Sequence, residues 1–289
     1  AMCNPGDEVL IPQPSYVSYE PCAILAGATP VIIDLKAENE FRLTAEELEA
    51  AITDKTKVLI LPFPNNPTGA IMEKSDLEAI AKIIEEHDIF VMSDEIYSEL
   101  TYKEKHVSII SLPGMKERTV YINGFSKAYA MTGWRLGYLI GPERVIEAAK
   151  KVHDFLTVGA AAPLQEAAVT GLKFGPEYYE WLKDLYTEKR DYLCGRLEQM
   201  GLPHTTPQGS YFVLVNISGF LERPEFSGWT DLEFCEWMIK KYGVAAVPGS
   251  SFFKEPVNNY IRLHFSRGKE TLKMAADRLE KMAKDYGFC

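Results

Sequence analysis

Residues 124–137 read GFSKAYAMTGWRLG and directly follow an apolar stretch, residues 119–123, that predicts a β-strand. Lys127 stands among small residues just beyond this strand, and Arg135 follows between Gly133 and Gly137. A lysine amine is nucleophilic only after it loses its proton, which crowding and nearby cations favour. Glycines let a ligand approach the backbone, and a guanidinium suits a phosphate. The segment therefore predicts a covalent site for a phosphorylated aldehyde.

Strands and amphipathic helices alternate around this segment. A Thr44–Glu47 pair matches a capping box, and Ser75 is the predicted start of a helix that reaches about His87. Continuous apolar strands separated by amphipathic helices are typical of a mostly parallel sheet with helices on both faces. The predicted strands span residues 9–11, 30–33, 57–61, 89–93, 119–123 and 136–140, with a further helix at 16–25.

The pattern changes after Pro142. Helices are predicted at 142–155, 163–173, 176–200, 231–241 and 269–286, with short strands at 210–215, 244–247 and 260–263. We therefore expect an α/β domain over residues 1–176 and a smaller α+β domain over residues 177–289, joined through the long helix.

Composition narrows the class of protein. The formal net charge is -10, which argues against a nucleic-acid or anionic-membrane surface. No apolar run has the length of a transmembrane helix. The five cysteines and five histidines are scattered without metal-ligand spacing. We expect a cytoplasmic protein with reduced thiols, no metal site, and no nucleic-acid or membrane partner.

Three polar motifs each follow a predicted strand. Residues 64–69 (PNNPTG) follow one strand, residues 94–97 (DEIY) follow the next, and Ser126-Lys127 follow the third. The carboxyl ends of parallel strands meet at one edge of a sheet, where ligands bind. The three motifs are therefore predicted to converge on one site.

The residue types in these motifs suit a substituted pyridine ring. Asp94 can pair with a protonated ring nitrogen, while Asn66 and Tyr97 can hydrogen-bond a phenolic oxygen. Tyr16 can stack on the ring face, and Arg135 can bind a phosphate. Together with the lysine, this set indicates pyridoxal 5'-phosphate.

The order and spacing of these motifs resemble the fold-type I, class I/II pyridoxal-phosphate aminotransferases over essentially the whole chain. Residues 247–250 (VPGS) and 260–263 (YIRL) extend the match. The overall look is closest to prokaryotic aromatic or broad-range enzymes. The resemblance implies that Lys127 forms the Schiff base and shuttles a proton, and that Arg262 binds the substrate α-carboxylate. It also implies a homodimer that moves an amino group from an aromatic, aspartate or broader set of amino acids to a 2-oxo acid.

Two departures from the family pattern stand out. Many relatives place a phosphate-binding serine three positions before the lysine, where this chain has Gly124; Ser126 is the candidate substitute. The family also has a long segment before the part that matches position 1. The resemblance thus predicts that domain 1–176 is incomplete on its N-terminal side and lacks a phosphate-cradling helix and a tyrosine that reaches the partner's cofactor.

Substrate identity is left open by these patterns. No arginine lies between Arg144 and Arg190, where some dicarboxylate-specific relatives carry one. Two other hypotheses remain at this point, a pyridoxal-phosphate C–S β-lyase and a catalytically impaired regulatory module. Taken singly, each residue has an ordinary interpretation, since most lysines are surface charges and Asn-Pro-Gly segments are usually turns. Their joint order and strand context favour transamination.

Overall fold

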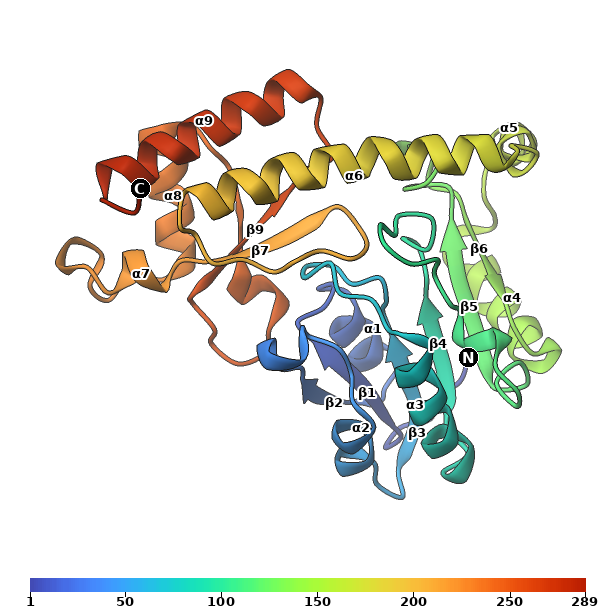
Figure 1. Ribbon diagram of the computed structural model, residues 1–289. Helices are drawn as coiled ribbons and strands as arrows, with labels where there is room; N and C mark the ends of the chain where they lie inside the picture. Colours follow the sequence, from blue (N-terminus) through green and yellow to red (C-terminus); the bar gives the residue numbers. More distant parts are fainter.

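Six strands form the central sheet of the computed structural model, which describes residues 1–289 (Figure 1). Their spatial order is β2-β1-β3-β4-β5-β6. The first five are parallel, and β6 pairs antiparallel with β5 at one edge. The strands are β1 (Glu8–Gln13), β2 (Thr29–Asp34), β3 (Thr56–Leu61), β4 (Phe90–Asp94), β5 (Thr119–Gly124) and β6 (Gly137–Ile140).

Helices cover both faces of this sheet because successive strand residues point to opposite sides. In β1, Leu10 packs in one core with α2 (Ala45–Ala51) and α3 (Lys74–Glu86). Its neighbours Val9 and Ile11 pack in another core with Ala23 of α1 (Tyr19–Leu25) and Val145 of α4 (Glu143–Thr157). The prediction of a mostly parallel sheet with helices on both faces is confirmed.

Two predicted helix starts were wrong. The helix expected from Tyr16 begins at Tyr19, after a turn at Val17 and Ser18. The helix expected to start at Ser75 is capped at Glu73, because the Asp76 carboxylate accepts a hydrogen bond from the Glu73 backbone N–H at 3.0 Å. By contrast, the Thr44–Glu47 capping box is present, with both reciprocal hydrogen bonds at 3.1 Å.

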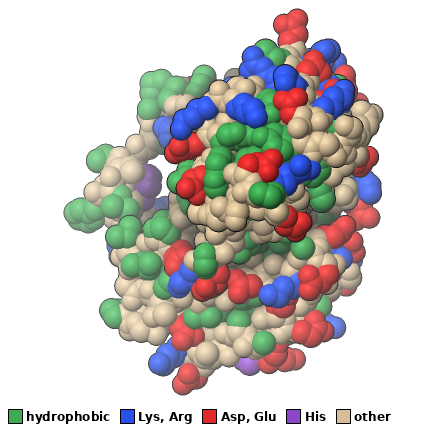
Figure 2. Space-filling view, turned by 90° about the vertical axis from the view of Figure 1, so that its left-hand side faces the viewer, with side chains coloured by type: hydrophobic (Ala, Val, Ile, Leu, Met, Phe, Trp, Pro, Cys, Tyr) green, Lys and Arg blue, Asp and Glu red, His purple; other side chains and the backbone are tan.

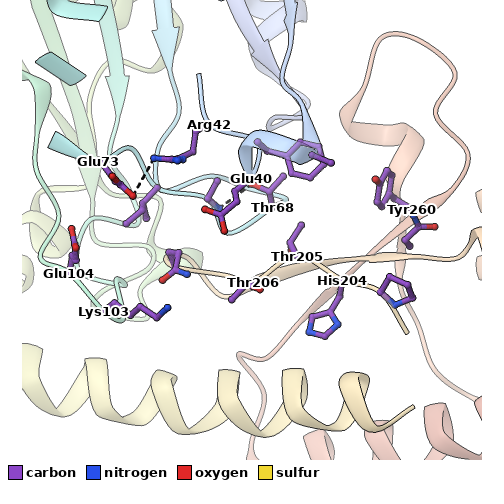
Figure 3. Close-up of a pocket in the computed structure, with 17 residues that line it drawn as sticks. Glu40, Arg42, Thr68, Glu73, Lys103, Glu104, His204, Thr205, Thr206 and Tyr260 are labelled. Atoms are coloured by element: carbon purple, nitrogen blue, oxygen red, sulfur yellow. Dashed lines mark hydrogen bonds and ion pairs between the residues drawn. The ribbon is translucent and has the colours of Figure 1, made fainter. Parts of the chain in front are cut away.

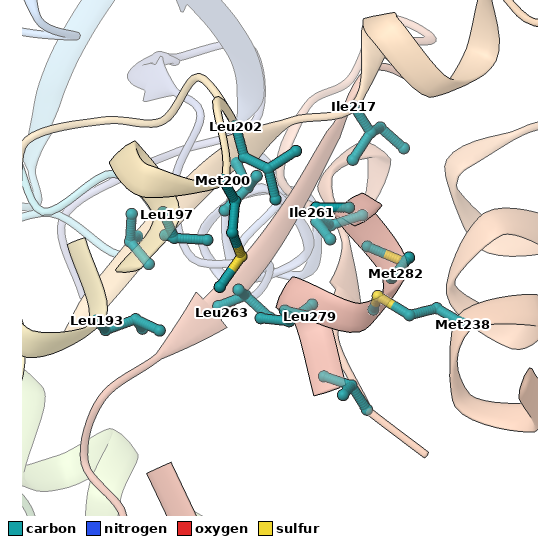
Figure 4. Close-up of a cluster of buried hydrophobic side chains, with 14 of the residues drawn as sticks. Leu193, Leu197, Met200, Leu202, Ile217, Met238, Ile261, Leu263, Leu279 and Met282 are labelled. Carbon is teal, nitrogen blue, oxygen red and sulfur yellow. The ribbon is translucent and has the colours of Figure 1, made fainter. Parts of the chain in front are cut away.

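A second, three-stranded antiparallel sheet forms the C-terminal part, in the order β7-β9-β8. The 24-residue α6 runs across the molecule from α5 toward α8 and α9 (Figure 1). Leucines and methionines of α6, α8 and α9 pack on β9 in a separate core (Figure 4). The elements are α5 (Ala162–Leu172), α6 (Pro176–Gln199), β7 (Phe212–Asn216), α7 (Ser218–Leu221), α8 (Asp231–Tyr242), β8 (Val247–Pro248), β9 (Tyr260–His264) and α9 (Lys269–Asp285).

The segment just before β7 is hydrogen-bonded to the turn that follows β3. The backbone N–H groups of Gln208 and Gly209 donate to the Gly69 carbonyl at 2.8 and 2.9 Å. Gly69 has a φ of 77°, and a Cβ there would lie 2.5 Å from Cβ of Pro207. Only glycine fits this contact. The PNNPTG turn is thereby held against the C-terminal part of the chain.

The surface carries charges of both signs. On the face shown in Figure 2, acidic and basic side chains are interspersed without a continuous basic patch. None of the helices combines the length and apolar character needed to cross a bilayer.

Candidate active site

All of the predicted site residues line one cavity of about 430 Å³. It lies beyond the carboxyl ends of β1, β3, β4 and β5, as expected for a parallel sheet. Of the predicted site residues, Arg262 comes from the second sheet, where it lies in β9. The residues are Tyr16, Asn66, Asp94, Tyr97, Ser126, Lys127, Arg135 and Arg262.

Lys127 lies in an aromatic environment. Its Nζ donates a hydrogen bond to the hydroxyl of Tyr211 at 3.1 Å. The same nitrogen lies 5.4 Å from the ring centroid of Tyr97 and 5.7 Å from that of Tyr211. Burial raises the pKa of Tyr97, and the neighbouring Tyr211 raises it further. Tyr97 therefore stays protonated and remains a hydrogen-bond donor beside the lysine.

Asp94 ends β4 as a buried carboxylate. The Tyr19 hydroxyl donates to its Oδ2 at 2.8 Å, and the Ile96 backbone N–H donates to its Oδ1 at 3.2 Å. Burial raises the pKa of Asp94, and these two hydrogen bonds oppose that shift. Burial also raises the pKa of Tyr19, followed by the charge of Asp94. A cation placed against Asp94 would relieve the cost of burying its charge.

The adjacent Glu95 is 1% exposed and belongs to a different network. Its carboxylate accepts hydrogen bonds from the hydroxyls of Ser93 at 2.8 Å and Ser108 at 2.6 Å, and it also contacts Nε2 of His106. The Asn123 side chain donates to the Glu95 carbonyl at 3.0 Å. Glu95 thus fixes the loop between β4 and β5 and does not line the cavity.

Arg262 reaches the cavity from β9. Its Nη1 donates to Oδ1 of Asn66 at 2.7 Å, and its guanidinium carbon lies 4.2 Å from the ring centroid of Phe212. Burial lowers the pKa of Arg262, but an arginine remains charged in a protein. Its buried Nε has no hydrogen-bond partner. A part-buried cation with an unpaired donor suits an anionic ligand such as a carboxylate.

One corner of the cavity is formed by Ser126, Thr132 and Arg135. Arg135 adopts a left-handed conformation with φ 55°, and its Nη1 donates to the Thr132 carbonyl at 2.9 Å. The Thr132 hydroxyl donates to the Ser126 carbonyl at 2.7 Å. Because the Thr132 hydroxyl has already donated its proton, the Ser126 hydroxyl and the Arg135 guanidinium are the donors that this corner offers a phosphate.

The structure explains the glycine at position 124. Gly124 pairs with Gly137 where β5 meets β6. A Cβ at Gly124 would lie 2.8 Å from Cα of Gly137 and 2.9 Å from the carbonyl oxygen of Leu136. Both atoms belong to the backbone and cannot move aside cheaply. A serine is therefore excluded here unless β6 shifts.

Sequence patterns missed four residues at the site: Tyr19, Thr132, Phe212 and the lysine's partner Tyr211. Tyr19 stood inside a predicted helix, three positions after Tyr16, and that spacing is its only signal. Tyr211 and Lys127 are 84 positions apart. No local pattern reports a contact over that separation.

A second cavity of about 480 Å³ lies elsewhere between the two sheets (Figure 3). None of the predicted site residues lines it. Its Arg42 is already paired with Glu73 at 3.2 Å and with Asp76 at 2.8 Å. The cavity is slightly larger than the lysine site but lacks convergent reactive groups, so volume alone does not locate the chemistry.

The donor set of the first cavity fits pyridoxal phosphate. Lys127 offers an amine for an aldehyde, Asp94 takes part in no salt bridge, and the corner at Arg135 suits a phosphate. A parallel sheet that presents these groups at its strand ends defines a pyridoxal-phosphate-dependent enzyme of fold type I.

Comparison with known proteins specifies the family. The model of the family "Aminotransferase class I and II" matches residues 1–279. An aspartate aminotransferase of Pyrococcus abyssi is 41% identical over 99% of this chain and 72% of its own length. The aromatic-amino-acid aminotransferase 2 of Thermococcus litoralis is 43% identical over 97% of this chain and 71% of its own. The crystal structure of an aromatic aminotransferase from Pyrococcus horikoshii has a TM-score of 0.91 and 40% identity, and covers 99% of this chain and 75% of that one.

The chain belongs to the class I and II aminotransferase family and is a pyridoxal-phosphate-dependent aminotransferase. These relatives do not favour the β-lyase or the regulatory hypothesis.

Proposed function

We propose that this aminotransferase takes amino groups mainly from aromatic and other large apolar amino acids and passes them to a 2-oxo acid. The observation that carries the proposal is the surroundings of Arg262, a part-buried cation with an unpaired Nε in a cavity whose remaining walls are largely apolar. Those walls include Pro62, Pro64, Ile96 and Phe212.

Lys127 is the proposed catalytic residue. When bound, pyridoxal phosphate supplies an aldehyde that captures amino groups and a ring that absorbs the electrons of a broken C–H bond. With the cofactor bound, Nζ of Lys127 would hold its aldehyde carbon, the carbonyl oxygen leaving as water. Once an amino donor has displaced it, the free Nζ accepts the proton from the substrate α-carbon.

Other side chains hold and tune the cofactor. Asp94 pairs with the ring nitrogen and keeps it protonated, which the burial of this carboxylate supports. Tyr97 and the free amide nitrogen of Asn66 donate to the phenolic oxygen. Tyr16, which is 47% exposed, is proposed to cover the ring from the open side.

The phosphate is assigned to the corner formed by Ser126, Thr132 and Arg135. The Ser126 hydroxyl and the Arg135 guanidinium supply donors there without the serine that many relatives carry. Ser126 takes over the role that Gly124 cannot fill, because position 124 has no room for a side chain.

Substrate orientation follows from Arg262. Its Nε and remaining Nη hydrogens bind the α-carboxylate, which leaves the side chain of the donor against the apolar walls. Arg135 and Arg262 are the only arginines that line the cavity. Arg135 is assigned to the phosphate and Arg262 to the α-carboxylate. No further guanidinium in the cavity is left for the side-chain carboxylate of aspartate, so aromatic donors are favoured.

A donor panel tests this proposal. Purified protein with pyridoxal phosphate and 2-oxoglutarate is given phenylalanine, tyrosine, tryptophan, methionine or aspartate, and glutamate is measured. We expect kcat/KM for the aromatic donors to exceed that for aspartate about tenfold or more, which corresponds to about 1.4 kcal/mol. A preference for aspartate would contradict the substrate assignment. Pyruvate and ammonia without glutamate would indicate elimination instead.

A homodimer is proposed as the working assembly. Phe155 and Leu156 of α4 and the adjacent Val158 are 91%, 76% and 83% exposed. Exposed apolar side chains gathered in this way are typical of protein interfaces. Sedimentation of the purified protein measures the assembly, and a monomer at micromolar concentration would contradict it.

Two further assignments accompany this proposal. Separate cores for the two sheets support a division into domains 1–176 and 177–289. Five unpaired cysteines support a cytoplasmic location. Limited proteolysis near position 176 and fractionation of cells test these two assignments.

A further inference from the structure

The amine of Lys127 has a partner that belongs to none of the sequence motifs. Tyr211 stands immediately before β7, and its hydroxyl accepts a hydrogen bond from Nζ of Lys127 at 3.1 Å. The hydrogen bond joins the segment after β5 of the central sheet to the segment before β7 of the second sheet. This inference rests on the proposed role of Lys127.

Packing fixes the position of the Tyr211 ring. It stacks on Tyr186 of α6 with centroids 6.0 Å apart, and it meets Tyr97 edge-on at 5.4 Å. The Tyr211 carbonyl accepts a hydrogen bond from the backbone N–H of Phe265 at 3.0 Å. A ring held on two sides and anchored through its backbone keeps its hydroxyl in one place.

A phenol can form a hydrogen bond with a lysine side chain whether the lysine is an ammonium or a neutral amine. Its oxygen accepts a hydrogen bond from an ammonium, and its O–H donates to a neutral amine. The ring centroid of Tyr97 also lies 5.4 Å from Nζ, which favours a cation there. The Tyr211 hydroxyl can therefore stay bound to Nζ while that nitrogen gains or loses a proton.

We propose that Tyr211 is a positioning residue that holds Nζ of Lys127 whenever this nitrogen is not bonded to the cofactor. Its hydroxyl orients the free amine while the α-carbon proton moves onto the lone pair of Nζ and is then delivered to the cofactor. Loss of its hydroxyl consequently slows proton transfer and leaves cofactor capture intact.

Chemical labelling of the apoprotein is the first test. Wild type, Tyr211→Phe and Tyr186→Phe are treated with dilute acetic anhydride, and acetylation of each lysine is followed by mass spectrometry. In Tyr211→Phe we expect Lys127 to be acetylated several-fold faster, because loss of one hydrogen bond frees the amine. The other lysines serve as internal references. Tyr186→Phe removes a hydroxyl from the neighbouring stacked ring and should match wild type. Equal Lys127 rates in all three proteins would overturn the proposal.

Single-turnover kinetics of the loaded enzyme is the second test. With phenylalanine as donor, Tyr211→Phe should slow the half-reaction about five- to tenfold, as expected for one lost hydrogen bond. The isotope effect with α-deuterated phenylalanine should rise, while cofactor affinity and the visible spectrum stay as in wild type. A slower half-reaction with an unchanged isotope effect would make Tyr211 merely structural and overturn the proposal.

Lys127→Ala separates this inference from the function on which it rests. If Lys127→Ala retains the wild-type half-reaction, the role of Lys127 itself is wrong. If Lys127→Ala is inactive and Tyr211→Phe behaves as wild type, only the role of Tyr211 is overturned.

Discussion

Arg262 in β9 donates a hydrogen bond to Asn66, 196 positions earlier in the chain, with Nη1 2.7 Å from Oδ1. The pair joins the proposed substrate-carboxylate site to the proposed cofactor-ring site. It uses one guanidinium nitrogen and the amide oxygen, so Nε of Arg262 and the amide nitrogen of Asn66 remain to bind ligands.

Replacing Arg262 should therefore impair donor binding more than cofactor binding. In Arg262→Gln we expect KM for phenylalanine to rise about 10- to 100-fold, as for the loss of charge-assisted hydrogen bonds. The affinity for pyridoxal phosphate should change little. Steady-state kinetics and a cofactor titration measure both quantities. Arg278→Gln, an exposed change in α9, is the control; an equal effect there would refute the assignment.

Lys127→Ala should abolish covalent retention of the cofactor. Borohydride reduction of the wild-type holoenzyme, followed by mass spectrometry, should place the cofactor on the peptide that contains Lys127. The variant should show no such adduct and should lose transamination by at least about a thousandfold. Lys103→Ala, at the second cavity, should retain both adduct and activity. An adduct at any other lysine in the wild type would show that the site is misassigned.

Asp94 links activity to the pH dependence of stability. Burial raises the pKa of Asp94 above its ordinary value of 3.8. An acid whose pKa is higher in the folded state binds more protons in the folded state than in the unfolded state. The apoprotein therefore loses stability as the pH rises from the unfolded-state pKa through the folded-state pKa of Asp94. Asp94→Asn should thus make the apoprotein at least as stable as wild type at neutral pH, while transamination collapses. Thermal melts with and without cofactor measure this. A large loss of apoprotein stability in the variant would contradict the argument.

Glu95 should matter for stability and little for chemistry. Glu95→Ala leaves the buried hydroxyls of Ser93 and Ser108 and the His106 ring without their shared acceptor. We expect the free energy of unfolding to fall by about 3–5 kcal/mol in urea titrations. Glu99→Ala, at an exposed position four residues on, should stay within about 0.5 kcal/mol of wild type. Similar losses for both variants would contradict the assigned network.

Gly124→Ser should not restore a phosphate-binding serine. The new side chain would press on the backbone of β6, so we expect a loss of about 1–3 kcal/mol in unfolding free energy and weaker cofactor binding. Gly133→Ala is a matched control in the same segment, because its added Cβ meets nothing within 4 Å. Tighter cofactor binding by Gly124→Ser would show that the register of β5 and β6 is misjudged.

Local patterns in the sequence determined the order of strands and helices and the place of Asp94 and Lys127. Continuous apolar runs, capping pairs and polar residues directly after a strand are all readable within a few positions. Parallel strands then force their carboxyl ends to one edge, so the convergence of the motifs follows from topology alone.

The tertiary structure decided which residue of a motif lines the cavity and which distant residues contact it. Asp94 and Glu95 are adjacent acids, but only Asp94 lines the cavity, because Glu95 is bound to Ser93, Ser108 and His106. The contact from Lys127 to Tyr211 spans 84 positions. Such pairs depend on how two cores pack against each other, and neither propensity nor periodicity encodes that packing. The sequence alone thus predicted Lys127 as the reactive lysine, whereas the three-dimensional packing supplied its partner.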